Sequence, residues 1–377
     1  MYSIFVAKRK KIYSIILAVL AFIGYTILAA QPIPPETILG LNWLRTLDEA
    51  NDEEGYAGGS LIPFILGNRF GYVDSSGTLH LNREREQTIS LSPEFWAEYA
   101  NAPQELVIYN PRMGIEIVLD NPDSYPIFLD GRIFLISKDQ TSLKELSREG
   151  DVLWQYDFEA PLTCIDAAGS YVLTGTLDGV IDLLDRGGNP LFPSFAPGAA
   201  RIPVILACRI SSDGSKLAVI SGIDNQRFLF LELFGSADYR VTYHESLPGS
   251  GFRREVQMSF IANDTKVVFE QEAGLGIYDV RSRSTITLPL PGRLLALDTE
   301  GRDGLFFYLS TGETSISGSA ADRSAEREEK RLVALKLPDM ELVNVPFRSE
   351  AFFLSRRGNE LFIGGGNSIA SFTINKR

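Results

Sequence analysis

Residues 124–189 contain a pattern that restricts the fold more than any other part of the chain. Short apolar runs of four to seven residues alternate there with Asp-Gly, Glu-Gly, Ala-Gly and Gly-Gly turns. Such spacing is typical of antiparallel strands joined by tight turns. Four runs make one unit, at 126–129, 132–137, 142–146 and 152–158, and the pattern starts again at Leu162. A repeated four-strand unit predicts the blades of a β-propeller.

Seven such units can be aligned on the turn between their first and second strands. The marker residues of these turns are Gly67, Gly131, Gly169, Gly214, Asn263, Gly304 and Gly358. Their spacings are 64, 38, 45, 49, 41 and 54 residues, and propeller blades run roughly 40–50 residues. We interpret the long first spacing as an insertion over residues 92–123, with a helix-like segment (PEFWAEYA) and a hairpin; an eighth blade is the alternative. The expected fold is all-β, a seven-bladed propeller of four-stranded antiparallel blades over residues 38–377.

The two ends of this repeat region predict how the ring closes. The seventh unit contains only three strands, and residues 38–47 (ILGLNWLRTL) are similar to the fourth strand of the second unit. Propellers commonly close by borrowing a strand from the other end of the chain, which removes an exposed edge. We therefore predict that residues 41–47 pair beside residues 369–373.

The N-terminus has the composition of a membrane-targeting segment. Residues 1–11 are basic, with Lys8, Arg9, Lys10 and Lys11, and residues 12–30 are uncharged and overwhelmingly apolar. A helix over 12–30 is roughly 28 Å long, close to the hydrocarbon thickness of a bilayer. We predict a transmembrane signal anchor, a cytoplasmic tip at 1–11, a proline-rich tether at 31–37 and an extracytoplasmic propeller, periplasmic in a double-membrane cell. A cleaved signal peptide is the alternative.

Two sequence stretches resemble known propeller repeats. Residues 150–156 (GDVLWQY) are similar to a quinoprotein-type outer strand, and residues 210–222 (ISSDGSKLAVISG) are similar to WD40 inner strands. The chain thus resembles the broad group of WD40-like and quinoprotein (PQQ)-like propellers, without the Gly-His and Trp-Asp dipeptides of true WD40 repeats. The resemblance implies a comparison with envelope assembly factors that use this fold without a cofactor.

Charge and residue counts limit the chemistry of the chain. The net charge is −12, and residues 31–377 carry −16, which argues against a nucleic-acid partner. His80 and His244 are too few for a histidine-based zinc site, and we expect both on solvated surfaces. Cys164 and Cys208 occupy first strands of neighbouring units; we predict buried free thiols, with a disulfide as the alternative. No metal or cofactor is expected.

Two polar segments are predicted to be loops. Residues 48–54 are acidic but lack the alternating order of a calcium loop. Residues 313–331 (ETSISGSAADRSAEREEKR) are low in apolar residues and interrupt the sixth unit. We interpret the first as a solvated loop and the second as a mobile one.

One face of the propeller is a candidate interaction face. The loops between second and third strands share a face with the blade-to-blade connections. This face is predicted to gather Trp96, Tyr99, Arg201, Asp224, Gln226, Arg227, Arg253 and Arg254. Four arginines on one face of an acidic protein can receive an anionic ligand or partner surface. Ordinary solvated loop charges with acidic partners are the alternative.

These observations favour a membrane-tethered, non-enzymatic scaffold that binds an envelope protein. One alternative is a propeller enzyme, a quinoprotein-type dehydrogenase or a lactonase-like hydrolase, with a metal or cofactor in the central channel. Asp166, Asp298 and Glu350 are the nearest carboxylates for such a site. A sensor of small molecules or glycans is the remaining alternative, because fold does not determine function.

Overall fold

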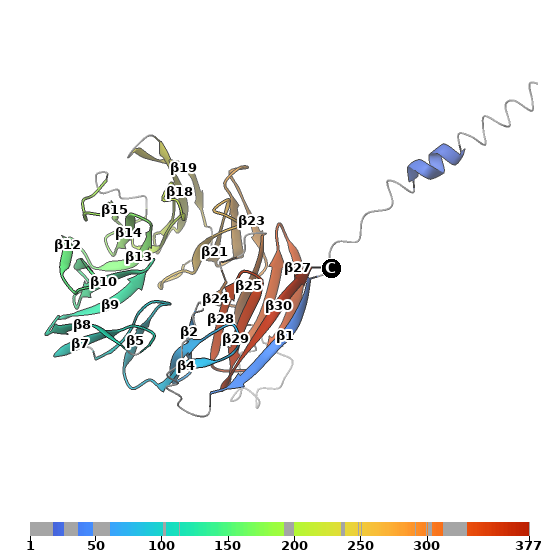
Figure 1. Cartoon of the computed structure of the whole chain (residues 1–377). Helices are drawn as coiled ribbons and strands as arrows, with labels where there is room; N and C mark the ends of the chain where they lie inside the picture. Colours follow the sequence, from blue (N-terminus) through green and yellow to red (C-terminus); the bar gives the residue numbers. More distant parts are fainter. Residues whose placement is uncertain are drawn as a thin grey trace, which may run out of the picture. The chain divides into compact units, whose positions relative to one another are not determined.

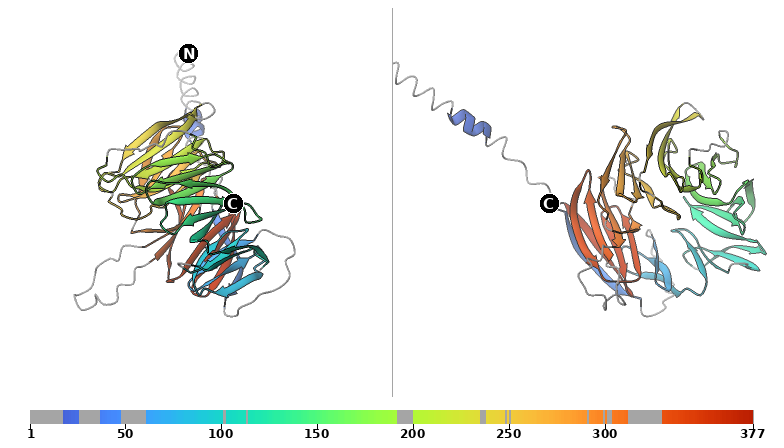
Figure 2. Two further views of the ribbon diagram at one scale, coloured as in Figure 1. Left: turned by 90° about the vertical axis from the view of Figure 1, so that its left-hand side faces the viewer. Right: turned by 180° about the vertical axis from the view of Figure 1, so that it is seen from behind.

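The computed structural model describes residues 18–25, 37–47, 61–100, 103–112, 114–191, 200–234, 238–247, 249, 251–290, 292–298, 300, 304–311 and 330–376. The chain divides into two units, residues 40–374 and residues 1–39 with 375–377. In the larger unit, eight antiparallel sheets are arranged as blades around one axis (Figure 1, Figure 2).

Each blade is a meander whose described strands run outward from the axis. Blades 1–4 are β2 (Ile62–Leu66), β3 (Arg69–Val73) and β4 (Leu79–Glu84); β5 (Thr88–Leu91), β6 (Trp96–Tyr99), β7 (Glu105–Tyr109) and β8 (Ile115–Asp120); β9 (Ser124–Leu129), β10 (Arg132–Ser137), β11 (Ser142–Leu146) and β12 (Val152–Asp157); and β13 (Leu162–Ala168), β14 (Tyr171–Thr176) and β15 (Ile181–Leu184). Blades 5–8 are β16 (Ile205–Ile210), β17 (Lys216–Ser221), β18 (Arg227–Phe234) and β19 (Asp238–Ser246); β20 (Met258–Ile261), β21 (Lys266–Gln271), β22 (Gly274–Asp279) and β23 (Ser284–Leu288); β24 (Leu294–Leu297), β25 (Leu305–Thr311), β26 (Lys330–Lys336) and β27 (Met340–Phe347); and β28 (Phe352–Arg357), β29 (Glu360–Gly365), β30 (Ser368–Lys376) and β1 (Thr37–Thr46). Innermost strands of neighbouring blades lie side by side, as β13 beside β16 and β28 beside β2.

The propeller has eight blades, so the predicted count of seven is wrong. Residues 92–123 are not an insertion, because β6, β7 and β8 form a four-stranded sheet with β5. The segment PEFWAEYA contains strand β6 rather than a helix. Trp96 and Ala97 are both buried, because a middle strand of a blade is covered on both faces and loses the alternation of an edge strand. Blade 1 has three described strands and blade 2 is short, so both fit within the spacing of 64 residues.

The first turn of blade 2 lacks the residue type used to align the units. All seven marker residues have positive φ angles, between 55° and 74°, a conformation that glycine and asparagine adopt readily. In blade 2 the turn is closed by Ser92 instead, whose Oγ accepts hydrogen bonds from the N–H groups of Glu94 (3.3 Å) and Phe95 (3.0 Å). The side chain of Ser92 thus replaces the glycine as the turn-forming element.

The predicted closure of the ring is confirmed. Strand β1 lies beside β30 and completes blade 8 as its outermost strand. Asn42 connects the two strands, because its Nδ2 donates to Ser371 Oγ (3.1 Å) and its Oδ1 accepts from Thr373 Oγ1 (2.7 Å). The N–H of Leu47 also donates to the carbonyl oxygen of Asn367 at 2.8 Å.

The predicted transmembrane helix is not supported by the structure. Residues 18–25 form a helix, and within the described ranges no helix is long and apolar enough to span a bilayer. Residues 1–17 and 26–36, which hold the rest of the predicted tip, helix and tether, lie outside the described residues, as do the acidic run 48–54 and residues 313–329. Lys330 and Arg331, assigned to the predicted mobile loop, are the first residues of β26.

The core consists of separate clusters between neighbouring blades. Seven clusters occupy the junctions from blade 1–2 to blade 6–7 and the closing junction of blade 8 with blade 1. Between blades 5 and 6, the rings of Phe228 and Phe269 stack with centroids 4.5 Å apart. Burying one such phenylalanine stabilises the fold by about 1.5–3 kcal/mol. Among the described residues, apolar packing of this kind thus joins neighbouring blades at seven of the eight junctions, the junction of blades 7 and 8 being the exception.

Two tryptophans of outer strands pack on glycines of the following blade. Trp43 of β1 lies on Gly77 of blade 1, and Trp154 of β12 lies on Gly188 of blade 4; a Cβ atom at either glycine would come within 2.7 Å or less of the indole ring. Both glycines have positive φ angles, 86° and 75°. Such a close approach needs a residue without a Cβ atom.

Candidate functional site

Three loop segments of blades 5 and 6 form one surface, which we call the loop platform. It comprises residues 200–204, 222–227 and 251–256, which lie at the ends of strands where blade-to-blade connections and second-to-third-strand loops meet. Asp224 joins the first two segments, because its carboxylate accepts from the N–H groups of Arg201 (3.2 Å) and Ile202 (3.4 Å). Gln226 joins the second and third, because its Nε2 donates to the carbonyl oxygen of Phe252 at 2.8 Å.

The pKa of Asp224 shows how these contacts favour a charged carboxylate. Desolvation alone would raise this pKa, but the backbone N–H donors, first that of Arg201, outweigh it. The pKa of Asp224 therefore lies below its usual value. The platform contains an anion that is already satisfied by its own backbone.

Arg254 is fixed within the platform and is not a free cation. Its guanidinium donates to both carboxylate oxygens of Glu270, at 3.0 and 2.7 Å, and lies over the ring of Phe252. Glu270 is buried and also accepts from the N–H of Leu294 in blade 7. A bidentate pair of this kind holds the guanidinium in one orientation. Arg254 thus ties the segment 251–256 to blade 6, and Glu270 in turn ties blade 6 to blade 7.

Arg201 and Arg253 are the exposed cations of the platform. Both side chains are exposed, and no acidic side chain among the described residues forms an ion pair with either. Arg227, at the start of β18, is half-buried, and its Nε has no described hydrogen-bond partner. The same holds for Oε1 of Gln226, which is 1% exposed. Because Nε of Arg227 and Oε1 of Gln226 are buried, the cationic groups that the platform presents to solvent are the side chains of Arg201 and Arg253.

Two residues of the predicted interaction face lie elsewhere. Trp96 belongs to the core between blades 1 and 2, 1% exposed, and its Nε1 donates to the carbonyl oxygen of Asn110. Tyr99 lies at the end of β6, half-buried, with its ring parallel to that of Tyr125. The structure thus brings together Arg201, Asp224, Gln226, Arg227, Arg253 and Arg254 at blades 5 and 6, whereas Trp96 and Tyr99 lie in blade 2.

The carboxylates considered for a channel site do not converge. Asp166 of β13 accepts from the N–H of Ile210 in blade 5, and burial raises its pKa despite the nearby charge of Arg209. Asp298 follows β24 and lies 3.8 Å from Arg356 of β28. Glu350 is exposed in the connection between blades 7 and 8. Among the described residues, no group of three or more His, Cys, Asp or Glu side chains could hold a metal ion.

The histidine and cysteine predictions have different outcomes. His80 is not a solvated surface residue: it is 8% exposed, and its Nε2 lies 2.9 Å from Asp74 Oδ2. His244, in contrast, is exposed on the outer strand β19, as predicted. Cys164 and Cys208 are free and buried, as predicted. Burial, together with the neighbouring Cys164, raises the pKa of the Cys208 thiol, which makes it a poor nucleophile.

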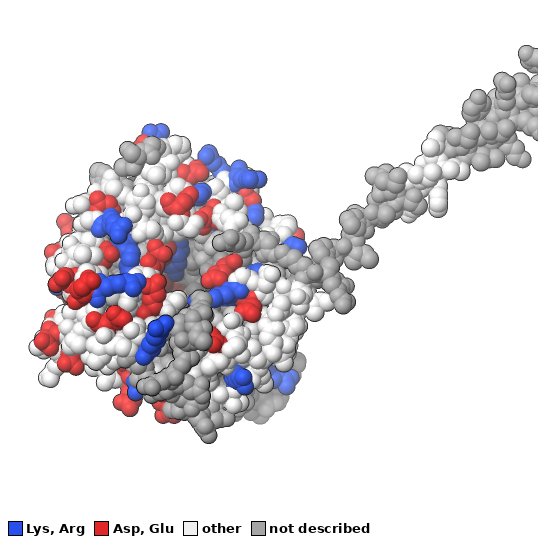
Figure 3. Space-filling view, viewed as in Figure 1, with Lys and Arg blue, Asp and Glu red and all other residues white. Residues whose placement is uncertain are grey.

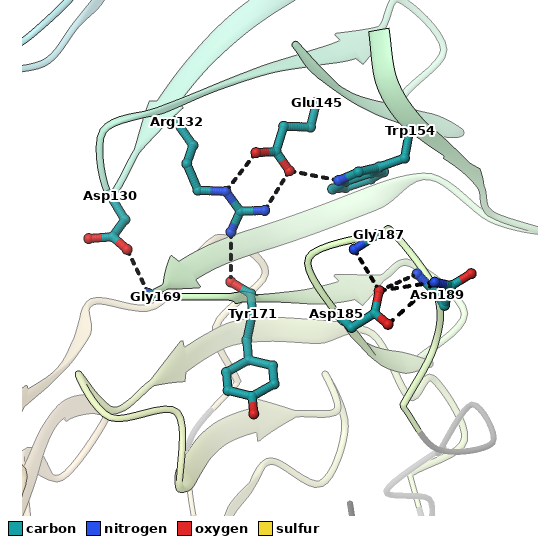
Figure 4. Close-up of polar contacts among 9 residues, drawn as sticks. All are labelled: Asp130, Arg132, Glu145, Trp154, Gly169, Tyr171, Asp185, Gly187 and Asn189. Atoms are coloured by element: carbon teal, nitrogen blue, oxygen red, sulfur yellow. Dashed lines mark hydrogen bonds and ion pairs between the residues drawn. The ribbon is translucent and has the colours of Figure 1, made fainter. Parts of the chain in front are cut away.

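A buried polar network at the junction of blades 3 and 4 was not predicted from the sequence (Figure 4). Arg132 donates to both oxygens of Glu145 (2.9 and 2.5 Å) and to the carbonyl oxygen of Tyr171 (3.2 Å). Trp154 Nε1 donates to the same carboxylate at 2.7 Å, and Asp130 Oδ2 accepts from the N–H of Gly169 at 2.6 Å. The bonds to Glu145 lie within blade 3, whereas the Arg132–Tyr171 bond and the exposed Asp130–Gly169 bond connect blade 3 to blade 4. Trp154, in the quinoprotein-like stretch, is the one residue of this network that the sequence analysis had singled out.

Charges on the visible face of the molecule do not segregate by sign. Figure 3 shows basic and acidic side chains interspersed over the described surface. Several of them form ion pairs between neighbouring blades, as Arg148 with Glu94 and Arg283 with Glu232. Arg201 and Arg253 of the loop platform are not in such ion pairs, and within the described residues the same is true of other exposed arginines, such as Arg83 and Arg186.

Comparisons with known proteins agree with this architecture. A family model described as a beta-propeller protein matches residues 5–377. A protein of Treponema pallidum (strain Nichols), described as uncharacterized, is 25% identical over 329 residues, 85% of this chain and 86% of that protein. Two solved structures share the fold: BamB from Moraxella catarrhalis (TM-score 0.56, 13% identity, 89% of this chain and 100% of that one) and the dihydro-heme d1 dehydrogenase NirN (TM-score 0.50, 12% identity, 75% and 60%). The resemblance to propeller repeat proteins is thereby confirmed at the level of the β-propeller fold and family.

Proposed function

The chain belongs to the family of beta-propeller proteins, and from this premise we propose that it acts as a non-enzymatic scaffold that binds a partner protein in the cell envelope. The loop platform is the binding surface in this proposal. The similarity to BamB supports it only as a likeness of fold. Placement of the propeller outside the cytoplasm is also part of the proposal, supported by the basic residues that precede the apolar N-terminal stretch.

The observation that carries this proposal is the pair of exposed arginines on a backbone that is already fixed. Asp224, Gln226 and the Arg254–Glu270 pair hold the three segments together through the backbone N–H of Arg201 but without hydrogen bonds from the side chains of Arg201 or Arg253. A surface that is rigid before binding loses less conformational entropy when a partner docks. Arginine is also enriched among the residues that dominate binding energy at protein interfaces.

Crosslinking in intact cells tests the proposal. A photoreactive amino acid replaces Arg253, and the same amino acid replaces Arg148 of blade 3 as a control. Arg148 is a suitable control because its side chain is 68% exposed but lies in a turn between third and fourth strands, at the opposite face. We expect one dominant envelope protein to be captured from position 253 and not from position 148.

Charge reversal then connects the captured protein to the arginines. We expect Arg201→Glu to reduce the crosslinking yield from position 253 several-fold, and Arg148→Glu to leave it unchanged. Capture of no protein from position 253, or of the same set of proteins from both positions, would contradict the proposed function.

A further inference from the structure

The outer strands of the blades differ in how they protect their free edges. In an antiparallel blade the outermost strand presents unpaired N–H and C=O groups, which can pair with a strand of another chain. Natural proteins block such pairing with bulges, charges or proline on the edge strand. The outer strands of blades 1–7 can be compared by these three devices.

Five outer strands carry a bulge, in which two residues stand opposite one residue of the neighbouring strand. The extra residues, on β4, β8, β12, β19 and β27, are His80, Glu116, Leu153, Thr242 and Leu342. In blade 4 the edge of β15 is instead covered by residues 190 and 191, since Leu184 bridges Pro190 and the N–H of Leu191 donates to Leu183. These edges are unsuited to regular pairing.

Strand β23 of blade 6 has none of these devices. It pairs with β22 in unbroken register from Asp279↔Ser284 to Leu275↔Leu288. Its sequence, Ser-Thr-Ile-Thr-Leu, contains no charge and no proline, and β-branched residues favour the extended conformation. It is the last strand of its sheet, and no described strand pairs with its outer side.

The inner face of β23 is anchored, so the strand is held ready for pairing. Gln271 Nε2 donates to Thr287 Oγ1 at 2.9 Å, and the hydroxyl groups of Tyr243 and Thr285 lie 3.4 Å apart. Ile286 faces the other way and is 41% exposed. A preformed edge of this kind allows main-chain hydrogen bonds with little loss of entropy.

Charges near β23 indicate what kind of strand it can accept. Arg281, in the turn before β23, is exposed and has no ion pair among the described residues, whereas Arg283 is bound to Glu232. An acidic residue at the end of an added strand would complement Arg281. A second copy of this chain offers no acid there, because β23 is followed by the segment Pro-Leu-Pro-Gly-Arg at 289–293.

We propose that β23 is a strand-addition site for an uncharged, extended segment of a partner protein that ends in an acidic residue. The added strand runs antiparallel to β23, as β22 does, so that its C-terminal end lies near Arg281. This site is separate from the loop platform. It therefore adds a second contact surface to the propeller.

Peptide binding to the full chain tests this site. The probe is a fluorescein-labelled peptide Thr-Val-Thr-Val-Thr-Glu, compared with Thr-Val-Thr-Val-Thr-Lys and with a version N-methylated at alternate residues. We expect the Glu-ended peptide to bind roughly threefold more tightly than the Lys-ended one, the size of an exposed ion pair. The N-methylated peptide should not bind, because it lacks the main-chain donors.

Two matched variants locate the site on the propeller. Ile286→Lys places a charge on β23, and Val241→Lys places one on the bulged strand β19, where the native residue is 39% exposed. We expect Ile286→Lys to weaken peptide binding about tenfold and Val241→Lys to leave it unchanged. Thermal melting of both variants checks that they fold.

Three results would overturn the inference. The first is that the wild-type protein does not bind the Glu-ended peptide. The second is that Val241→Lys weakens binding as much as Ile286→Lys does. The third is that sedimentation shows a dimer that Ile286→Lys abolishes, which would assign the edge to a second copy of the chain. None of them affects the crosslinking result at Arg253. Failure of this site and failure of the proposed function are therefore distinguishable.

Discussion

The junction of blades 3 and 4 and the junction of blades 7 and 8 both contain a buried carboxylate beside an arginine, but they differ in how fully these groups are bonded. Glu145 receives two hydrogen bonds from Arg132 and one from Trp154. Asp298 receives one from the N–H of Glu300, at 3.2 Å, and its other oxygen lies 3.8 Å from Arg356 with no hydrogen-bond partner among the described residues. Arg356 instead donates to the carbonyl oxygens of Gly358 and Leu305.

This difference shows that burial alone does not decide what a charge pair contributes. Burial raises the pKa of Asp298 to about 6, and the Glu300 N–H and the charge of Arg356 offset only part of this effect. A network in which every polar group is bonded stiffens its surroundings, whereas a partly bonded one retains a desolvation cost. The blade 3–4 junction is of the first kind and the blade 7–8 junction of the second.

Removing the carboxylate from the fully bonded network should have the largest effect. Glu145→Ala leaves the guanidinium of Arg132 and the Nε1 of Trp154 without their acceptor in a buried site. We expect the free energy of unfolding to fall by about 3–5 kcal/mol, measured by urea denaturation. The double variant Arg132→Met with Glu145→Leu should recover part of this loss; a double variant as unstable as Glu145→Ala would show that packing, not the unpaired charge, is responsible.

Asp298, at the junction of blades 7 and 8, should make the free energy of unfolding depend on pH. Because the folded-state pKa of Asp298, about 6, lies above its ordinary value of 3.8, the folded protein holds this proton more tightly than the unfolded chain. The contribution of this group, on the order of 2–3 kcal/mol, is fully present below about pH 4 and is lost as the pH rises through about 6. We expect Asp298→Asn to flatten the unfolding free energy between pH 4 and 7. An unchanged pH profile in this variant would contradict the assignment.

Two glycine-to-alanine variants test how closely Trp154 packs at the junction of blades 3 and 4. In Gly188→Ala the new methyl group would lie 2.5 Å from the ring of Trp154, whereas in Gly169→Ala it meets no atom within 4 Å. Both positions have positive φ angles, so both variants carry the backbone cost of about 1–2 kcal/mol. We expect Gly188→Ala to be less stable than Gly169→Ala by about 1–2 kcal/mol. Equal thermal midpoints would mean that Trp154 does not pack on Gly188.

The exposed pair between blades 2 and 3 should have the smallest effect. Arg148 and Glu94 lie 2.7 Å apart, but their side chains are 68% and 48% exposed. We expect Arg148→Ala to change the free energy of unfolding by less than about 1 kcal/mol, and less at high salt. A loss comparable to that of Glu145→Ala would contradict the view that bonding and burial together determine the contribution of a pair.

Much of the fold could be predicted from turn residues. The blade count was wrong because one first turn has no glycine or asparagine to mark it. Seven first turns contain a glycine or asparagine with positive φ, and each marks a real blade. The first turn of blade 2 is made by the side chain of Ser92, which gives no comparable signal in the sequence. The helix-like appearance of residues 93–100 hid β6, because a strand buried on both faces shows no alternation.

The sequence predicted which loops form the candidate site, but not which side chains in these loops are exposed. Positions after second strands and between blades were enough to group Arg201, Gln226 and Arg253. The sequence could not separate Arg253, which is exposed, from Arg254, which is bound to Glu270. Trp96 was assigned to the face because its segment was assigned to an insertion. The buried networks of Arg132 and Asp298 depend on residues far apart in the chain.

The sequence by itself determined that the chain is an all-β propeller of repeated strands and that its first and last strands meet, because turn chemistry and apolar patterning act over a few residues. Only the tertiary structure decided the number of blades, which arginines stay free and which outer strand keeps an unprotected edge. These properties depend on what each side chain meets on the neighbouring blade. Such contacts are set by packing between segments distant in sequence, which local patterns do not encode.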